Sequence, residues 1–433
     1  MPAQARLARS LAKEGTLGQL VRGGAAGAVF QFLNKVLALA ASALLARALG
    51  VEGYGLYAFA IALTGMASIA AEMGMGPLTL RETARAAGPD APSLIGGQLR
   101  AATMLVLGIG LILIAAGSAV VLTAPLSLDA VGVATLLLAL PLVIIGALTR
   151  IGVAALAGLK RLVASQAFEQ VFSPLLVCVG AAALYLGPER FATPQAAMLI
   201  QVASGLLAVL FLALTLRRYL STREHSVLPT RELVARGWPF LMIGSALVLN
   251  QQLDTLLVGI VLGTGEVGPY RVASQGAQLA MFMAFVINTI ISPYVARYHA
   301  DGDLFALRKL FVHARAAGVA SVAGALALYL VAGEQLIALA FGTAFVGAAP
   351  LLAILTAGYL GNALAGPCGT ILAMTGHERA SARALWTLAI ANGVLTCAAG
   401  ALFGLYGVAT VTALTITLYQ GWLRYILWRE LKI

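Results

Sequence analysis

Charged side chains stand inside segments of this sequence that are otherwise apolar, and their chemistry needs an explanation. Lys35 lies within the apolar stretch 24–48, and Asp254 lies near the middle of the stretch 237–262. An ionised group at such a depth in hydrocarbon costs on the order of 3 kcal/mol or more, so we expect it to face a partner, water or a substrate. A Lys or Arg in a wet cavity could pair with phosphate, whereas an Asp could couple to a proton or sodium gradient.

Amides and hydroxyls accompany these charges at helical spacing. Arg271 begins a stripe at i, i+3, i+4 and i+7, and shorter polar faces occur on the first, second and seventh expected helices. Because such faces can line one central cavity, we expect them to bind the substrate. The predicted substrate-binding residues are Gln31, Asn34, Lys35, Arg150, Asn250, Gln251, Arg271, Ser274, Gln275 and Gln278, and the candidate ion-coupling residues are Asp254, Glu72 and Glu169.

Several of these residues could instead have a role in membrane contact or helix packing, with no part in binding. Lys35 and Arg150 could extend their charges to the headgroups, and Arg271 near a helix end could contact lipid phosphate. Glu72 lies near the end of its helix, where an exposed carboxylate is as reasonable as a buried one. The polar face around Glu169 could serve helix packing alone.

Composition places most of the chain in a membrane. Of the 433 residues, 61% are hydrophobic and 10% charged, and the mean hydropathy is +0.93. Apolar runs of about 20 residues, the length that spans a bilayer, recur throughout. We therefore expect an all-α integral membrane protein with about twelve transmembrane helices, at 24–48, 56–76, 98–122, 128–156, 165–187, 194–219, 237–262, 268–298, 310–331, 347–374, 380–403 and 405–428.

An internal duplication is visible in the sequence. The stretch LLARALGVEGYGLY (44–57) returns as LGTGEVGPY (262–270), with Leu-Gly and Gly-x-Tyr matched at a constant offset of 213. Two repeated halves of this kind predict two six-helix bundles with the same bend after the first helix. Weaker echoes are Pro77 with Arg81 against Pro293 with Arg297, and AGLKR (157–161) against TGHER (375–379).

The duplication suggests the domain limits. We expect a cytoplasmic interfacial segment at 1–23, an N-terminal six-helix bundle at 24–220, a cytoplasmic linker at 221–236 and a C-terminal six-helix bundle at 237–433. Residues 6–22 could form an amphipathic helix on the membrane surface or a disordered basic tail.

The net charge of +11 could suggest a nucleic-acid partner, but its distribution argues against one. Most of the 28 Lys and Arg residues fall in the N-terminal segment, the C-terminus and the even-numbered connections. This pattern predicts a multi-pass membrane protein with both termini in the cytoplasm. No cleavable signal peptide is evident, and the three Cys residues lie far apart in apolar segments.

Sequence motifs for catalysis are missing. There is no Gly-x-x-x-x-Gly-Lys-Ser/Thr loop, no His-Glu-x-x-His and no Gly-x-Ser-x-Gly. We expect no catalytic residues, no metal site and no cofactor, and hence a carrier rather than an enzyme.

The chain resembles the polysaccharide transporter branch of the multidrug/oligosaccharidyl-lipid/polysaccharide exporter superfamily, and in particular its O-antigen-type lipid-linked oligosaccharide flippases. The resemblance covers nearly the whole chain and is carried by LLARALGVEGYGLY with GMGPLTLRETAR, and by LDTLLVGIVLGTGEVGPYRVASQGAQLA with ISPYVARY. It implies a V-shaped, alternating-access transporter of the bacterial inner (plasma) membrane that moves an undecaprenyl-pyrophosphate-linked oligosaccharide for surface polysaccharide. Cationic cavity groups would engage the pyrophosphate, although the resemblance assigns them by helix position only.

Implied partners are membrane lipids, the polyprenyl-linked oligosaccharide, and a polysaccharide polymerase and glycosyltransferases. Two other functions stay open at this point. A cation-coupled multidrug exporter of the same superfamily would favour carboxylates and aromatic residues in its cavity. A membrane scaffold for glycan assembly would use the polar faces only to join helices.

Overall fold

The computed structural model describes residues 2–86, 91–123, 129–220 and 230–431, and every regular element among them is helical. The elements are α1 (Pro2–Glu72), α2 (Met75–Arg85), α3 (Ala91–Thr123), α4 (Ala130–Ala139), α5 (Leu142–Gly158), α6 (Leu162–Ala167), η1 (Phe168–Phe172), α7 (Ser173–Leu186), η2 (Glu189–Phe191), α8 (Pro194–Leu220), α9 (Thr230–Val261), α10 (Thr264–Ala280), α11 (Phe282–Ala300), α12 (Leu304–Phe341), η3 (Thr343–Ala348), α13 (Ala349–Ala365), α14 (Cys368–Met374) and α15 (Glu378–Leu431).

Twelve membrane spans can be counted in the described residues. Eight helices are long and apolar enough to cross a bilayer, and two bent segments, one in α9 and one at α10–α11, bring the number to ten. Two of the eight, α1 and α15, are each a pair of helices joined at a non-helical glycine, Gly50 and Gly404. Counting each pair as two spans gives twelve, as the hydropathy predicts.

The repeated bend is present in both halves. Gly50 has φ 71° and ψ −175°, and Gly263, its partner in the duplication, has φ 99° and ψ 161°. Side chains rarely tolerate this backbone region, so glycine is required for the chain to reverse between the first two helices of each repeat. The prediction of a duplicated, glycine-dependent turn is confirmed.

The weaker sequence repeat, AGLKR (157–161) against TGHER (375–379), has a structural alignment that differs from the alignment of its letters. Backbone amides close the two helices with equivalent bonds, Arg161 N to the Leu156 carbonyl (3.1 Å) and His377 N to the Leu372 carbonyl (2.9 Å). The offset between these bonds is 216 rather than the 218 of the matched letters. The left-handed residue is accordingly Lys160 (φ 61°) in one half and Gly376 (φ 82°) in the other.

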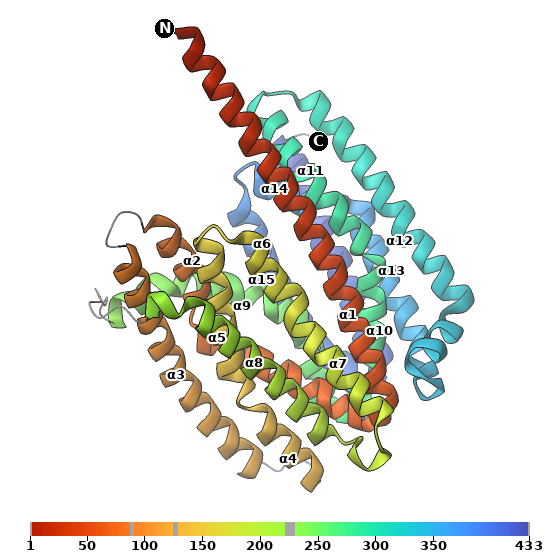
Figure 1. Cartoon of the computed structure of the whole chain (residues 1–433). Coiled ribbons are helices and arrows are strands. Elements are labelled where there is room, and N and C mark those ends of the chain that lie inside the picture. Colours follow the sequence, from red (N-terminus) through yellow and green to blue (C-terminus); the bar gives the residue numbers. More distant parts are fainter. Residues whose placement is uncertain (1, 87–90, 124–128, 221–229, 432–433) are drawn as a thin grey trace.

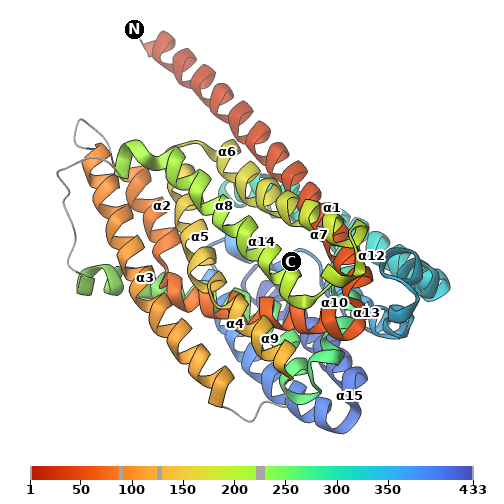
Figure 2. The same ribbon diagram turned by 60° about the horizontal axis from the view of Figure 1, so that its bottom comes forward.

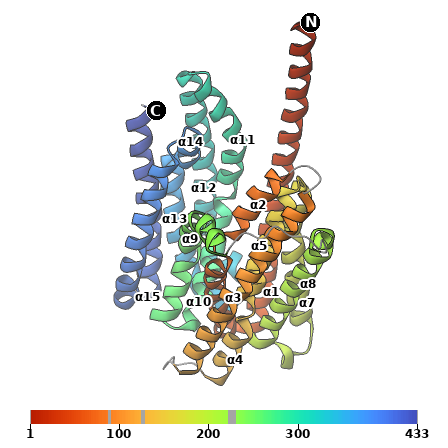
Figure 3. The same cartoon turned by 90° about the vertical axis from the view of Figure 1, so that its left-hand side faces the viewer.

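Two lobes result from this duplication, and Figure 3 shows them side by side. The N-terminal lobe contains α1–α8, with α2, α5 and α8 running together in Figure 2, and the C-terminal lobe contains α9–α15. The start of α1 and the end of α15 lie at the same end of the molecule, which we call the terminal face; the opposite face carries α4 and the bend within α1 (Figure 1). Each lobe has its own apolar core, and a third core joins the lobes.

Helices extend into two of the predicted connecting segments. Residues 2–22 are helical and continue into the first span, and this helix projects from the terminal face (Figures 1 and 2). In the predicted linker 221–236, residues 230–236 form the start of α9, and 221–229 lie outside the described residues.

Candidate functional site

The two lobes meet through the duplicated glycines. A Cβ atom added to Gly55 of α1 would overlap the carbonyl oxygen of Thr264, and one added to Gly268 of α10 would lie 2.7 Å from the carbonyl oxygen of Val51. The absence of side chains therefore lets the two backbones cross in direct contact. Because these glycines occupy matched positions in the repeat, the contact lies where the two halves are most alike.

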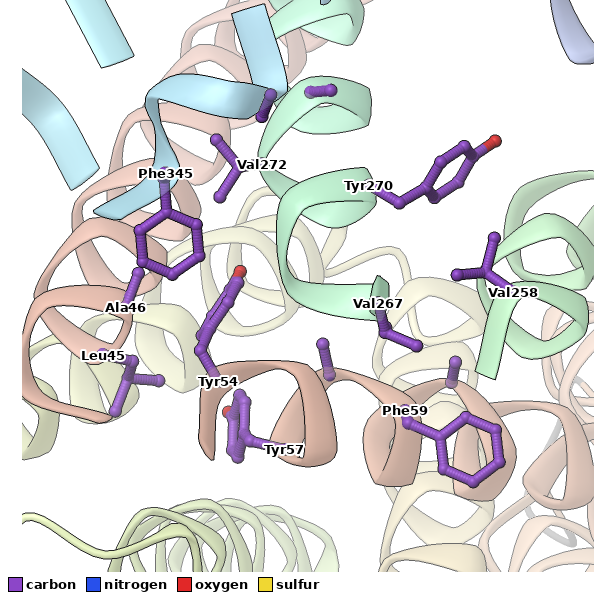
Figure 4. Close-up of a cluster of buried hydrophobic side chains, with 14 of the residues drawn as sticks. Leu45, Ala46, Tyr54, Tyr57, Phe59, Val258, Val267, Tyr270, Val272 and Phe345 are labelled. Carbon is purple, nitrogen blue, oxygen red and sulfur yellow. The ribbon is translucent and has the colours of Figure 1, made fainter. Parts of the chain in front are cut away.

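Aromatic residues extend this contact toward the opposite face. The Tyr54 ring packs edge-on against Phe345 of η3, with centroids 6.0 Å apart, and the Tyr54 hydroxyl hydrogen-bonds Ser42. Figure 4 shows Tyr54 and Phe59 of α1 gathered with Val267 and Val272 of α10 and with Phe345. The Arg47 guanidinium also bridges the lobes by donating to the Ala340 carbonyl at 3.0 Å. The lobes are thus closed against each other on this side.

A cavity of about 610 Å³ lies beside this contact. The N-terminal lobe contributes α1 alone, through Asn34, Lys35 and Ala38, and the C-terminal lobe forms the remainder. The polar residues in the C-terminal wall are Gln251, Gln252, Asp254, Thr255, Tyr270, Arg271, Ser274, Gln278, Tyr359, Asn362, Asn392, Thr412, Thr415, Tyr419 and Gln420. Such a wall offers hydrogen-bond donors and acceptors in a setting that is otherwise lipid-like.

Two cations face this cavity, one from each lobe. Lys35 and Arg271 are close enough for their charges to interact, and neither forms an ion pair with a carboxylate of the described residues. Arg271 makes one long hydrogen bond, from Nη1 to Gln252 Oε1 at 3.5 Å. Like charges repel at short range, so this pair is poised for an anion that would neutralise both.

The Asp254 carboxylate is buried at the C-terminal-lobe side of the cavity. It accepts hydrogen bonds from Asn392 Nδ2 (2.6 Å), Thr412 Oγ1 (3.0 Å) and the Tyr270 hydroxyl (3.3 Å). These partners come from α15 and α10, and all three are neutral. Their hydrogen bonds offset part of the cost of burying the charge, and none neutralises it.

A second polar cluster lies within the N-terminal lobe, apart from the cavity. Arg150 Nε pairs with Glu72 Oε2 at 2.6 Å, and the same guanidinium hydrogen-bonds Ser68. The other oxygen of Glu72 accepts the Gly76 amide at 3.0 Å, at the start of α2. Glu169, on the π-helical turn η1, is exposed and lies within electrostatic reach of Arg150.

The structure therefore divides the residues predicted from sequence. Seven of them, Asn34, Lys35, Gln251, Asp254, Arg271, Ser274 and Gln278, line the one cavity. Arg150, Glu72 and Glu169 belong to the N-terminal-lobe cluster instead, and among the described residues none of the expected second helix, 56–76, lines this cavity. Gln31 and Gln275 do not line the cavity, and Asn250 has a side chain outside the described residues.

Several cavity residues were missed by the sequence analysis. Asn392 and Thr412 contact Asp254, and Asn362, Tyr359, Tyr419 and Gln420 complete the wall. Among the described residues, Asn392 is the one polar residue that the part of α15 before Gly404 contributes to the cavity, whereas Thr412 begins a polar face at i, i+3, i+7 and i+8 with Thr415, Tyr419 and Gln420. For Asn392 the available signal was the cost of a polar side chain in a membrane, and for Thr412 it was helical spacing, the same signal that indicated the face of Arg271.

Comparison with solved structures identifies the class to which this fold belongs. The chain superposes on the lipid II flippase MurJ in an inward closed conformation, with a TM-score of 0.75, 13% identity and coverage of 93% of this chain and 87% of that one. It superposes on an inward-facing multidrug resistance MATE transporter of the MOP superfamily with a TM-score of 0.70, 15% identity and coverage of 94% and 99%. A MOP superfamily transporter from Pyrococcus furiosus, described as having a binding pocket of reverse polarity, follows with a TM-score of 0.56, 14% identity and coverage of 96% of both chains. The fold is therefore that of the MOP-superfamily transporters.

The sequence places the chain more narrowly. The family described as polysaccharide biosynthesis protein matches residues 20–299, more than half of the chain, and the chain belongs to this family. No curated protein matches the chain in sequence. The resemblance stated from the sequence motifs is confirmed at the level of the family, and the solved structures add the likeness in fold.

Proposed function

We propose that this protein is a flippase that moves an undecaprenyl-pyrophosphate-linked oligosaccharide from the cytoplasmic to the outer leaflet of the inner membrane, for surface polysaccharides of the O-antigen type. The observation that carries the proposal is the pair Lys35 and Arg271. These two cations come from different lobes, face one cavity and have no carboxylate partner among the described residues. The positive-inside distribution makes the terminal face the cytoplasmic one.

The chemistry of this substrate fits the cavity wall. A diphosphate carries negative charge and many acceptor oxygens, which ammonium and guanidinium groups bind strongly. Sugar hydroxyls both donate and accept hydrogen bonds, and the amides of Asn34, Gln251 and Gln278 can do the same. Neither part of the headgroup crosses about 30 Å of hydrocarbon unaided, whereas the prenyl chain can stay in the lipid throughout.

Movement of the two lobes would give alternating access. Each lobe has its own core, and the lobes touch across the glycine crossing of Gly55 and Gly268. Rocking about such a contact exposes the same site first to one side and then to the other. Glycosyltransferases would supply the substrate on the cytoplasmic side, and a polymerase would consume it outside.

Asp254 is the ion-coupling group in this proposal, because it is buried in the cavity wall and its hydrogen-bond partners among the described residues are all neutral. A proton or a sodium ion bound there would remove the uncompensated charge. We expect Asp254→Asn to transport at a reduced rate that no longer responds to proton or sodium gradients. Reconstituted vesicles with imposed gradients measure this, and a wild-type gradient response in the variant would exclude Asp254.

The cation pair is tested by Lys35→Gln combined with Arg271→Gln. We expect the lipid-linked glycan to accumulate in the inner leaflet of cells that carry only this variant, with at least a tenfold loss of surface polysaccharide. Arg308→Gln combined with Lys309→Gln removes the same charge from exposed positions of α12 and serves as the matched control. Normal surface polysaccharide in the cavity variant, at equal membrane expression, would refute the proposed site.

One observation supports a second function, cation-coupled export of organic cations. Tyr270, Tyr359 and Tyr419 line the cavity together with Asp254, so the wall is more aromatic than the sequence stripes indicate. Carboxylates and aromatic faces bind organic cations. Drug-resistance assays separate the two functions: resistance that depends on Asp254 and is unaffected by Lys35→Gln with Arg271→Gln would favour drug export.

A further inference from the structure

A second pocket, which we call the α2–α3–α9 pocket, lies apart from the transport cavity and shares no residue with it. Its volume is about 260 Å³. Helices α2 and α3 of the N-terminal lobe form most of it, through Thr83, Arg85 and Gln98 among others, and α9 of the C-terminal lobe adds Arg236. The pocket therefore spans the boundary between the lobes.

Two guanidinium groups are available to a ligand in this pocket. Arg85 is exposed and forms no ion pair within the described part of the chain. Arg236 pairs with Glu232 one helical turn away, but both side chains are more than 40% exposed. Exposed pairs of this kind are worth only about 0.5 kcal/mol, so Arg236 can turn to a ligand at little cost.

The carboxylate in the pocket is already neutralised. Glu82 Oε1 accepts from both Nε (3.1 Å) and Nη2 (2.9 Å) of Arg81. The Arg81 guanidinium also lies 5.4 Å from the centre of the Phe240 ring of α9. Glu82 is thus held against its own cation and leaves Arg85 and Arg236 to set the charge of the pocket.

Buried donors in the pocket also lack partners. The Gln98 side chain is 7% exposed, and its Nε2 has no hydrogen-bond partner among the described residues. Thr83 is 4% exposed, and its hydroxyl is likewise unpartnered. An unmet buried amide is costly, and a ligand rich in acceptor oxygens would relieve that cost.

We propose that the α2–α3–α9 pocket binds a phosphate group, with Arg85 and Arg236 pairing with its charge and Gln98 donating to one of its oxygens. Phosphate supplies acceptors only, which matches a site that offers guanidinium and amide donors. The group comes from the headgroup of an anionic lipid or from a soluble phosphate.

A ligand in this position would hold the two lobes together. On the same elements, a Cβ added to Gly237 of α9 would collide with the Met73 carbonyl oxygen, and one added to Gly74 would lie 2.8 Å from the Leu241 amide. The backbones of the two lobes are therefore in direct contact at Gly74 and Gly237. A phosphate bridging Arg85 and Arg236 adds a second link between the same helices, so its binding stabilises this conformation.

Thermal unfolding of the purified, delipidated protein tests the proposal with three probes: phosphatidylglycerol, inorganic phosphate and diacylglycerol, which has no phosphate. We expect phosphatidylglycerol to raise the melting temperature by about 3 °C or more and diacylglycerol to have no effect. In Arg85→Gln with Arg236→Gln, we expect the apparent Kd for the lipid to rise about tenfold or more.

Gln98→Leu is the second variant. It removes the unpartnered donor without leaving a charge, so we expect a protein that folds and responds more weakly to the lipid. Arg297→Gln with Arg308→Gln is the control, because Arg297 forms an exposed i, i+4 pair with Asp301 like that of Arg236. Stabilisation by phosphatidylglycerol alone supports a lipid source, and stabilisation by inorganic phosphate supports a soluble one. No response to either probe, or an equal response in all variants, overturns the proposal.

Discussion

The two lobes share one fold but differ in the partners of their buried carboxylates. In the N-terminal lobe Glu72 is paired with Arg150 and also accepts a backbone amide, so its charge is matched within the protein. In the C-terminal lobe Asp254 has three neutral donors and, within the described residues, no ion pair with a cation. The duplication therefore kept the helices and changed the electrostatics. The lobe with the unmatched charge is the one that forms most of the cavity.

A matched pair of tyrosines shows the same divergence. Tyr57 and Tyr270 occupy equivalent positions of the Gly-x-Tyr motif. The Tyr57 hydroxyl donates to Gln201 Oε1 at 3.0 Å, whereas the Tyr270 hydroxyl donates to Asp254. One tyrosine therefore joins helices through a neutral bond, and its equivalent solvates a charge.

The largest expected effect is on access to the cavity, and it comes from substitutions at Gly55 and Gly268, where the two lobes are most alike. Gly55→Ala and Gly268→Ala should act similarly, because each adds a methyl group where the other lobe's backbone lies. We expect the opposite face to open, so that an impermeant thiol reagent applied from that side labels Ala38→Cys at least several-fold faster. Gly65→Ala is the control, since a Cβ there has no neighbour within 4 Å. Unchanged labelling in both variants would show that the crossing does not close this face.

The next largest effect is on stability, and it compares substitutions of the two carboxylates, Glu72 and Asp254. Glu72→Gln leaves Arg150 without its ion-pair partner and should destabilise the protein by about 2 kcal/mol, less than for a fully buried pair because the Arg150 side chain is 39% exposed. Asp254→Asn leaves no cation of the described residues without a partner, so it should lower the free energy of unfolding by about 1 kcal/mol or less. Melting curves in detergent compare the variants. Equal destabilisation by the two substitutions would remove the contrast between the lobes.

The smallest expected effect distinguishes the roles of Tyr57 and Tyr270. Tyr57→Phe removes the hydrogen bond to Gln201, and Tyr270→Phe removes the two long bonds to Asp254 and Thr412, so each should cost about 1 kcal/mol of stability. Only Tyr270→Phe should alter the response of transport to ion gradients, because only Tyr270 contacts Asp254. A gradient response changed equally by Tyr57→Phe would show that the effect is one of stability rather than of ion coupling.

Part of the site could be predicted from the sequence, because the spacing of residues along one helix decides which of them share a face. Arg271, Ser274 and Gln278 follow helical spacing, so their common face is a property of one helix, and all three line the cavity, whereas Gln275 of the same predicted stripe does not. Arg150 and Glu72 are 78 residues apart, and no periodicity within either helix could show that they pair. The rotation of each helix about its axis decides whether a polar face meets the cavity or another helix, and packing between helices sets that rotation.

The sequence by itself determined the membrane class, the count of spans and the duplication. These follow from the length of apolar runs and from glycine, whose backbone freedom is needed at Gly50 and at Gly263. Only the tertiary structure decided that Lys35 and Arg271 share a cavity, that Glu72 is neutralised and that Asp254 is not. Those outcomes depend on distances between side chains of different helices, and electrostatic interactions change strongly over a few ångströms.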